Sequence, residues 1–255
     1  MERMHPVSKL ADLLKQATQA YARPMGFAPA QARKQALSMA LIAELSAGDA
    51  ASIQAALAAG AEAILLPKGS EAGIADARAA AGKAPLGLVL TTGAKDDVAK
   101  LVTAGADFLL LEDTAIAGEV LTVDDVERLL QLDAAWPDSL IRGVEGLPLD
   151  GAVYRLPAGG GLTVHELMQL RRAAGLAGKT MYVAVPAGTP ASAARVLRDA
   201  GALGLIVAAA AVAEFAEAIR ALPQPKRKGE NLEASLPTGF MSSHKEEEPE
   251  EDDDD

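Results

Sequence analysis

One phrase occurs three times in this chain, and its spacing constrains the fold more than any other feature. The copies are AGAEAILLPK, AGADFLLLED and AGALGLIVAA, which begin at Ala59, Ala104 and Ala200. A weaker copy, DGAVYRLP, follows the second. The glycines of the four copies are 45, 46 and 50 residues apart: Gly60, Gly105, Gly151 and Gly201. A period of about 45 residues indicates an internal repeat in which each glycine precedes an apolar run.

A second set of apolar runs lies between these copies. Its members are MALIAELSAG (39–48), PLGLVLTTG (85–93), SLIRGVEG (139–146) and TMYVAVPAG (180–188). The runs of both sets are short, rich in Leu, Val and Ile, and show little alternation of apolar and polar residues. Such runs are typical of parallel strands that are buried on both faces.

Helical spacing of apolar residues fills the segments between the runs. These segments are 49–59, 73–82, 95–104, 122–135, 163–174, 190–200 and 211–221. Two begin with a capping box, Thr122 with Asp125 and Thr163 with Glu166. Each AGA glycine is expected to end a helix in a left-handed turn, and its alanines allow close packing of helix and strand.

Eight strands that alternate with seven or eight helices predict an α/β fold of the (β/α)8 TIM-barrel type over residues 37–223. The connection between the strand expected at 139–146 and the next one is too short for a full helix. An open doubly wound sheet is the alternative, but no GxGxxG follows the first strand.

The ends of the chain differ from this barrel. Residues 1–36 are expected to form an N-terminal helical extension, in which an amphipathic helix (8–21) plugs the barrel or contacts a membrane surface or a protein partner. Residues 224–255 are expected to be a disordered acidic tail and a second candidate contact for a protein partner. Residues 230–255 hold 11 of the 35 acids and one of the 24 bases, so the rest of the chain is nearly neutral and offers no nucleic-acid surface.

Cellular location is expected to be cytoplasmic. The chain has no cysteine, which fits a reducing compartment. It shows no signal-peptide core and no apolar run long enough to span a membrane.

Candidate functional residues are expected where the strands end, because TIM barrels place their sites at the C-terminal ends of the strands. The catalytic candidates are Lys68, Glu112 and Glu145, and the ligand-binding candidates include Glu44, Asp113 and Arg155. A desolvated lysine can form a Schiff base, and burial can raise the pKa of a carboxyl for acid/base work. Carboxylates at one mouth could also hold Mg²⁺. Charges at strand ends are, however, often only solvated or paired with one another.

A glycine-rich stretch, PAGGGLTVHEL (157–167), is a candidate anion site. Its glycines Gly159, Gly160 and Gly161 lead directly into a helix, whose N-terminus favours anions. His165 lies in the first turn of that helix. The alternative is a flexible connection with a surface histidine. No HExxH, Ser-His-Asp or P-loop pattern is present, so no metal or cofactor is assigned.

The phrases AGAEAILLP and AGADFLLLED resemble the aldolase-type, phosphate-binding TIM barrels, a group that includes thiamine-phosphate synthase, sugar-acid aldolases and flavin-dependent barrels. The resemblance covers residues 37–222 and is architectural. It implies phosphate binding by glycines after strands seven and eight. Strand seven keeps Gly188 in VPAGTP, whereas strand eight ends in alanines. No family's catalytic set matches, so no catalytic residue is carried over.

Two functions are therefore expected. The first is a barrel that binds a small anionic metabolite, phosphorylated or not, with lyase or isomerase chemistry. The second is a non-catalytic barrel that acts as a scaffold or regulatory interaction protein. The sequence alone does not decide whether the protein is an enzyme.

Overall fold

The computed structural model describes residues 9–19, 37–69, 71–159 and 161–223. The expected acidic tail (224–255) and most of the N-terminal extension lie outside these ranges. None of the helices in the described ranges is long and apolar enough to cross a membrane.

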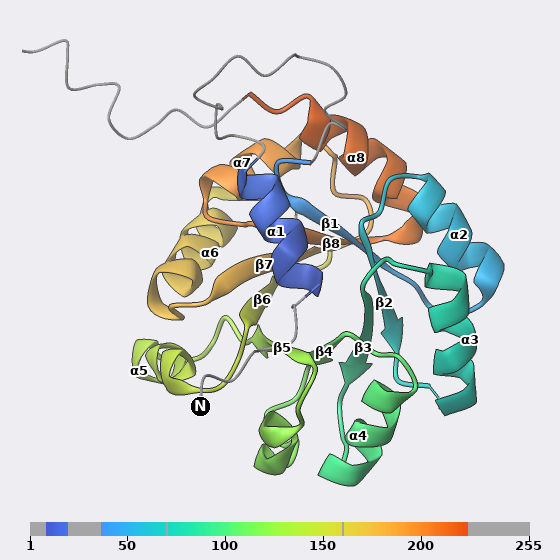
Figure 1. The fold of residues 1–255 in the computed structure, drawn as a ribbon. Helices are drawn as coiled ribbons and strands as arrows, with labels where there is room; N and C mark the ends of the chain where they lie inside the picture. Colours follow the sequence, from blue (N-terminus) through green and yellow to red (C-terminus); the bar gives the residue numbers. More distant parts are fainter. Residues whose placement is uncertain (1–8, 20–36, 70, 160, 224–255) are drawn as a thin grey trace, which may run out of the picture. The chain divides into compact units, whose positions relative to one another are not determined.

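Eight parallel strands form a closed barrel in chain order (Figure 1). They are β1 (Ala40–Glu44), β2 (Ala63–Pro67), β3 (Leu86–Leu90), β4 (Phe108–Leu111), β5 (Glu127–Leu132), β6 (Gly151–Arg155), β7 (Thr180–Val185) and β8 (Gly204–Ala208). Pairing of β1 with β8 closes the sheet. The predicted (β/α)8 barrel is confirmed.

Helices surround this barrel on its outside (Figure 1). They are α2 (Ala50–Ala58), α3 (Glu71–Ala81), α4 (Lys95–Thr103), α5 (Asp138–Gly143), α6 (Val164–Leu176), α7 (Ala193–Asp199) and α8 (Val212–Arg220), with short 3-10 helices η1 (Gly118–Thr122), η2 (Val144–Gly146) and η3 (Ala209–Ala211). The helices expected from periodicity are confirmed in all but one segment. The Thr163–Glu166 capping box at the start of α6 is also confirmed.

The exception is the region around the fifth strand. The helix predicted over 122–135 is wrong, because β5 lies there, and the strand predicted over 139–146 is wrong, because α5 and η2 lie there. Pro137 and Asp138 start α5. Ile141 of α5 and Val144 of η2, three residues apart, are buried. Consequently the connection that lacks a full helix is the one between β4 and β5, where η1 takes its place. The predicted Thr122–Asp125 capping box does not form, since Thr122 ends η1.

Two aromatic side chains fill the base of the barrel interior, where the strands begin. Phe108 and Tyr182 are buried within the interior apolar cluster. A Cβ added to Gly87 would lie 2.1 Å from the Phe108 ring, and one added to Gly204 would lie 2.5 Å from the Tyr182 ring. The glycines on neighbouring strands therefore make room for the aromatic rings, which lets a chain with few aromatic residues fill its barrel.

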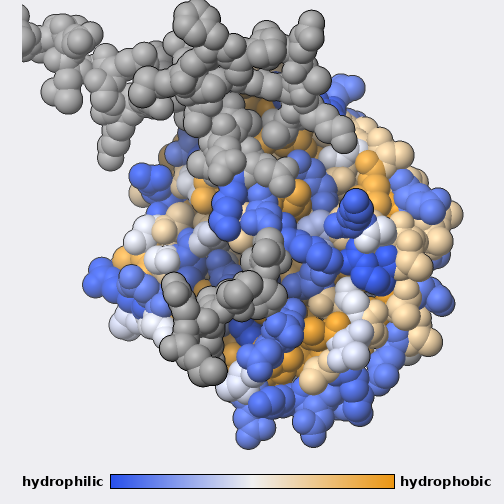
Figure 2. Space-filling model, in the orientation of Figure 1, coloured by the Kyte–Doolittle hydropathy of each residue, from blue (hydrophilic) through white to orange (hydrophobic). Residues whose placement is uncertain are grey.

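The helix α1 (Lys9–Gln19) closes the end of the barrel at which the strands begin, which is the first of the roles that the amphipathic pattern left open (Figure 1). Leu10 is fully buried in the interior cluster, and Leu13 and Leu14 pack against it. The N–H of Leu10 donates to Oε1 of the buried Glu127 at 2.7 Å. Around α1 this face of the molecule is largely hydrophilic, with scattered apolar patches (Figure 2).

One arrangement of hydrogen bonds recurs just before the even-numbered strands. The acid that precedes each of β2, β4 and β6 donates its N–H to a carbonyl of the previous strand, and its carboxylate accepts the N–H of that same residue. We call the three residues the base acids: Glu62 bonds Leu41, Asp107 bonds Leu86 and Asp150 bonds Arg128. At the fourth equivalent position Leu203 makes the backbone bond to Met181 without a carboxylate. The repeat unit is therefore a pair of strands.

The base acids correct the register of the fourth, weaker copy. Asp150 corresponds to Asp107, so Gly151 corresponds to Phe108 and not to Gly105. Gly151 is the first residue of β6 and does not end a helix. Gly105, in contrast, has φ of +122°, and a Cβ there would lie 2.7 Å from the Arg78 side chain, so its expected role after a helix is confirmed.

The base acids Glu62 and Asp107 differ in their charge environment. Replacing each by its amide is therefore expected to change the stability of the protein in opposite directions. Burial raises the pKa of Glu62 from 4.5 to about 7, although the N–H of Leu41 and the charge of Arg220 act in the other direction. Asp107 instead forms ion pairs with Lys9 at 2.7 Å and with Arg78 at 2.5 Å.

Because the folded state favours protonated Glu62, its contribution to the free energy of unfolding falls as pH rises from 4.5 to about 7. Glu62→Gln, which retains an acceptor for Leu41, should therefore stabilise the protein by on the order of 1–3 kcal/mol at about pH 8 and have little effect at about pH 4.5. Asp107→Asn should destabilise it by about 1–3 kcal/mol at about pH 8, because two cations lose their partner. Urea unfolding at both pH values measures these differences, and a destabilised Glu62→Gln protein at about pH 8 would contradict the first.

Candidate active site

Four polar side chains come together where the strands end. Along β1, β4, β5 and β6 the inward positions begin with apolar residues of the interior cluster, such as Ile42, Leu110, Leu129 and Val153. Two residues further along each strand, the inward position is polar. We call these four residues the mouth cluster: Glu44, Glu112, Gln131 and Arg155. The alternation of a β-strand places all four on the inside of the barrel, above its apolar core.

Arg155 is the centre of the mouth cluster. Its Nε donates to Oε1 of Gln131 at 3.0 Å. Its Nη2 lies 3.4 Å from Oε1 of Glu112 and 3.6 Å from Oε1 of Glu44. The side chain from β6 therefore reaches groups that β1, β4 and β5 supply, across the mouth of the barrel.

The mouth cluster is accessible and its ion pairs are loose. The side chains of Arg155, Glu44 and Glu112 are each about one third exposed, at 36%, 35% and 33%. The two ion-pair distances exceed the roughly 2.7–2.9 Å of a close charge-assisted hydrogen bond. Within the described part of the chain, Nη1 of Arg155 makes no hydrogen bond. The guanidinium can therefore bind an incoming anionic group through its free N–H donors while it keeps its hydrogen bond to Gln131.

A cleft of about 960 Å³ opens beside the mouth cluster. It runs from Glu112, Gln131 and Arg155 to the loop after β5 and the first turn of α6. The remaining residues that line it include Asp113, Asp133, Trp136, Tyr154, His165, Glu166, Gln169 and Pro186. Three predicted site residues, Glu44, Glu112 and Arg155, thus meet in one place, and Asp113 lies at the cleft beside them.

The loop between β5 and α5 forms one wall of the cleft, and Arg172 of α6 holds it. Arg172 donates from Nε to Oδ1 of Asp138 at 2.6 Å and from Nη2 to the carbonyl of Trp136 at 2.6 Å. A further bond joins Nη1 to the carbonyl of Ala134 at 3.3 Å. Asp133 folds the start of the loop, because its Oδ1 accepts the N–H of Ala135. The wall is therefore formed before any ligand arrives.

Lys68 does not join the mouth cluster. Its Nζ donates to the carbonyl of Thr92 at 3.1 Å, and the side chain is exposed. It lines a separate, smaller hollow with Glu71 and Asp97. The desolvation that a Schiff-base lysine requires is absent there.

Glu145 lies away from the mouth. Its predicted position depended on a strand over 139–146, whereas it belongs to η2 and is exposed. Its side chain lies against Gly178, two residues before β7 begins, at the opposite end of the barrel. The physical reason for proposing Glu145 as an acid or base is thereby removed.

The glycine loop after β6 is open, and its helix is already capped. Gly159 and Gly161 have positive φ, and a Cβ at either would meet nothing within 4 Å; Gly160 lies outside the described residues. Thr163 accepts the N–H of Glu166, and Glu166 accepts the N–H of Thr163. A carboxylate therefore already occupies the N-terminus where an anion was expected. Gly188, after β7, is exposed and also has positive φ.

Sequence reasoning did not include Gln131, Trp136 and Tyr154. Gln131 was missed because its segment was predicted to be helical. Had the strand β5 been predicted, the two-residue spacing from Leu129 would have placed Gln131 on the inside of the barrel. Trp136 and Tyr154 carry no motif. Within the described ranges no group of three or more His, Asp or Glu side chains is placed to hold a metal ion.

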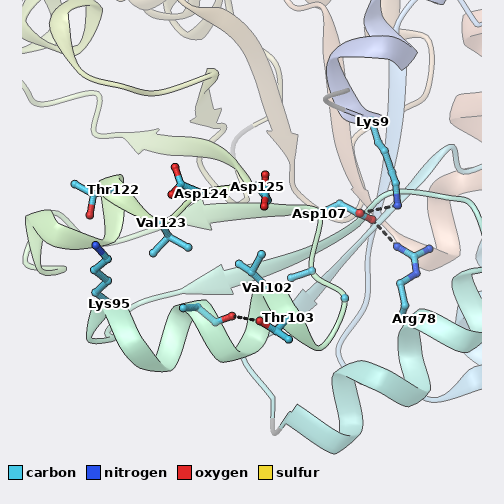
Figure 3. A pocket seen from close by; sticks show the side chains of 13 residues that line it. Lys9, Arg78, Lys95, Val102, Thr103, Asp107, Thr122, Val123, Asp124 and Asp125 are labelled. Carbon is cyan, nitrogen blue, oxygen red and sulfur yellow. Dashed lines mark hydrogen bonds and ion pairs between the residues drawn. The ribbon is translucent and has the colours of Figure 1, made fainter. Parts of the chain in front are cut away.

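Another hollow, of about 560 Å³, lies on the flank of the barrel between α4 and residues 122–125 (Figure 3). It occupies the gap that the missing helix between β4 and β5 leaves. Asp107 and its partners Lys9 and Arg78 lie at one end of it (Figure 3). Because these charges are paired with one another and serve the base of the barrel, we assign this hollow no function.

Comparisons with known proteins agree with the fold. No protein-family model matches the chain, and no curated protein matches it. Among solved structures, an HpcH/Hpal aldolase/citrate lyase family protein from Burkholderia cenocepacia is 16% identical with a TM-score of 0.54, over 68% of this chain and 89% of that one. A mutant tryptophan synthase α-subunit from Pyrococcus furiosus is 19% identical with a TM-score of 0.54, and the match covers 71% of this chain and 94% of that one. These similarities confirm the architectural resemblance to aldolase-type barrels and show the fold alone.

The hydrogen bonds of Arg172 predict that this residue determines the shape of the cleft wall. Arg172→Ala should free residues 133–138, so that the indole of Trp136, the single tryptophan of the chain, becomes more accessible to quenchers. Acrylamide quenching of tryptophan fluorescence measures this change. The neighbouring, exposed Arg171 supplies the matched control, Arg171→Ala, and equal quenching in both variants would show that Arg172 does not hold the loop.

Proposed function

We propose that this protein is a cytosolic barrel enzyme that binds a small anionic metabolite at the mouth cluster and acts on it by lyase or isomerase chemistry. The observation that carries the proposal is the convergence of Glu44, Glu112 and Gln131 on Arg155 at the C-terminal ends of four strands. A barrel needs no charges above its apolar core in order to fold, so a group of this kind favours a functional role.

The residues suit distinct roles. Arg155 offers a planar guanidinium with free donors, which matches the two oxygens of a carboxylate. Glu112, adjacent to it, is placed to take or give a proton at a ligand bound to Arg155. Gln131 orients the guanidinium through Nε, and Glu44 pairs with it at Nη2.

A carboxylate ligand agrees with the site better than a phosphorylated one. The end of β8 offers Ala208, Ala209 and Ala210 where phosphate-binding barrels of the resembled group have glycine. The other expected anion site, at Gly159 and Gly161, faces the Glu166 carboxylate at the start of α6. Arg155 is consequently the best-placed group for the anionic end of a ligand. One structural neighbour belongs to an aldolase/citrate lyase family, which is in keeping with the proposed lyase chemistry.

The alternative is a scaffold or regulatory protein. Arg155 already lies between two carboxylates, so its charge is balanced without a ligand. Val164 and Met168, one turn apart on α6, are 73% and 66% exposed, which suits a protein contact near the cleft.

A metabolite screen by thermal shift, followed by product analysis, separates the two functions. Ligands that stabilise the wild-type protein should carry a carboxylate and should bind at least about tenfold more weakly to Arg155→Gln, because the anionic end loses its charge partner. Glu112→Gln should retain binding but lose conversion, because an amide cannot carry the proton.

Arg142→Gln, which changes an exposed arginine on α5, is the matched control and should behave as wild type. Borohydride should trap no adduct at Lys68, because its amine is solvated. Ligands that bind equally well to Arg155→Gln would refute the site, and binding without conversion of any of them would favour the regulatory function.

A further inference from the structure

The outer part of the cleft is separate from the mouth cluster and has its own chemistry. We call it the side arm; it is lined by Asp133, Trp136, Tyr154, His165 and Glu166. It lies between the loop after β5 and the first turn of α6, and Arg172 fixes that loop. A ligand held by Arg155 and longer than a few atoms would extend into the side arm.

Negative charge dominates this cleft. Four carboxylates line it (Glu112, Asp113, Asp133 and Glu166), and Arg155 is the lining cation. Arg155 is itself shared between Glu44 and Glu112. Arg172 is not among the residues that line the cleft; its guanidinium pairs with the carboxylate of Asp138 and also bonds the carbonyls of Ala134 and Trp136 and the amide of Gln169. A ligand with two anionic ends would therefore be repelled in the side arm, whereas a cationic group would be attracted.

Tyr154 provides an independent indication of a ligand. Only 3% of this residue is exposed, and its side chain lines the cleft. Among the described residues its hydroxyl has no hydrogen-bond partner, and the oxygen is not among the fully enclosed unpartnered atoms, so it is accessible to a ligand. Burial, and secondly the charge of Glu166, raise the pKa of Tyr154, while the charge of Arg172 acts in the other direction. The phenol is neutral, and its oxygen can accept a hydrogen bond.

Trp136 adds an aromatic surface to the same arm. Indole is the side chain that attracts a cation most strongly through its π-system. An aromatic ring, a phenol without a partner in the described part of the protein and two carboxylates, those of Asp133 and Glu166, therefore line one hollow. Each of these groups favours a positively charged nitrogen that carries N–H donors.

We propose that the side arm binds an ammonium group, so that the substrate is an amino carboxylate with its carboxylate on Arg155 and its ammonium between Tyr154, Trp136 and Glu166. The carboxylate end rests on the proposed function, whereas the ammonium end does not. The substrate class is thereby narrowed from small anions to zwitterions.

Tryptophan fluorescence tests this proposal directly, because Trp136 is the single tryptophan of the chain and lines the side arm. The full-length protein is titrated at low ionic strength with three probes of equal chain length: aminohexanoate, hexanedioate and diaminohexane. Aminohexanoate should bind at least about tenfold more tightly than hexanedioate, which places a second anion in the acidic arm. Hexanedioate that binds as tightly or more tightly, or the absence of binding by all three probes, overturns the proposal.

Variants distinguish the two ends of the site. Glu166→Gln removes a charge but keeps the capping box, since glutamine also serves at that position; it should weaken aminohexanoate several-fold and leave hexanedioate no weaker. Glu214→Gln, at a first-turn acid of α8, is the matched control. Tyr154→Phe should weaken aminohexanoate without lowering stability, because the hydroxyl has no partner in the protein. Unchanged affinity in Glu166→Gln and Tyr154→Phe overturns the ammonium site.

The proposed function can fail separately. If Arg155→Gln leaves aminohexanoate unchanged and diaminohexane binds equally well, the carboxylate end is refuted while the ammonium site stands. If Arg155→Gln weakens aminohexanoate and hexanedioate alike, and the two bind with equal affinity, the carboxylate end stands and the ammonium site is refuted.

Discussion

Closure of the sheet by the pairing of β1 with β8 is the constraint on which the other features depend. Five residues of β1 are in register with β8, from Ala40 opposite Gly204 to Glu44 opposite Ala208. Once the sheet is closed, alternate residues of every strand must point inward, and their order along the strand sets their height in the barrel. The mouth cluster follows from this geometry, because its members lie on different strands and far apart in sequence.

The two ends of the barrel use charge in different ways. At the base, carboxylates are tied to backbone N–H groups, and Asp107 is enclosed by Lys9 and Arg78 (Figure 3). At the mouth, Arg155 has longer contacts and donors to spare. Charges at the base therefore stabilise the strand pairs, whereas those at the mouth remain available. This difference in contact length, more than the residue types, marks one end as the candidate site.

Much of the fold could be predicted from the sequence, because the two-strand repeat leaves a regular trace of glycine and apolar runs. Residues 122–146 could not be assigned correctly for a physical reason: ERLLQL and SLIRGVEG have similar apolar content, and packing decides which forms a strand. That single exchange removed Glu145 from the mouth and hid Gln131, which occupies an inward position of β5. Glu44, Glu112 and Arg155 were identified because each ends or directly follows a strand that was predicted correctly. The side arm was not predictable, since Trp136, Tyr154 and Glu166 meet only through tertiary packing.

The position of α1 has a consequence for exchange with solvent. Leu10 of α1 closes the barrel at the N-terminal ends of the strands, and Phe108 and Tyr182 fill the interior next to it. The barrel interior is thus closed at the N-terminal ends of the strands. Water displaced from the mouth cluster must therefore leave through the opening by which a ligand enters. A ligand at Arg155 would be shielded from solvent on the side of the barrel interior and would remain open to solvent on the side of the cleft. Substitutions in α1 are accordingly expected to change the stability of the barrel and to leave ligand access to the mouth cluster unchanged.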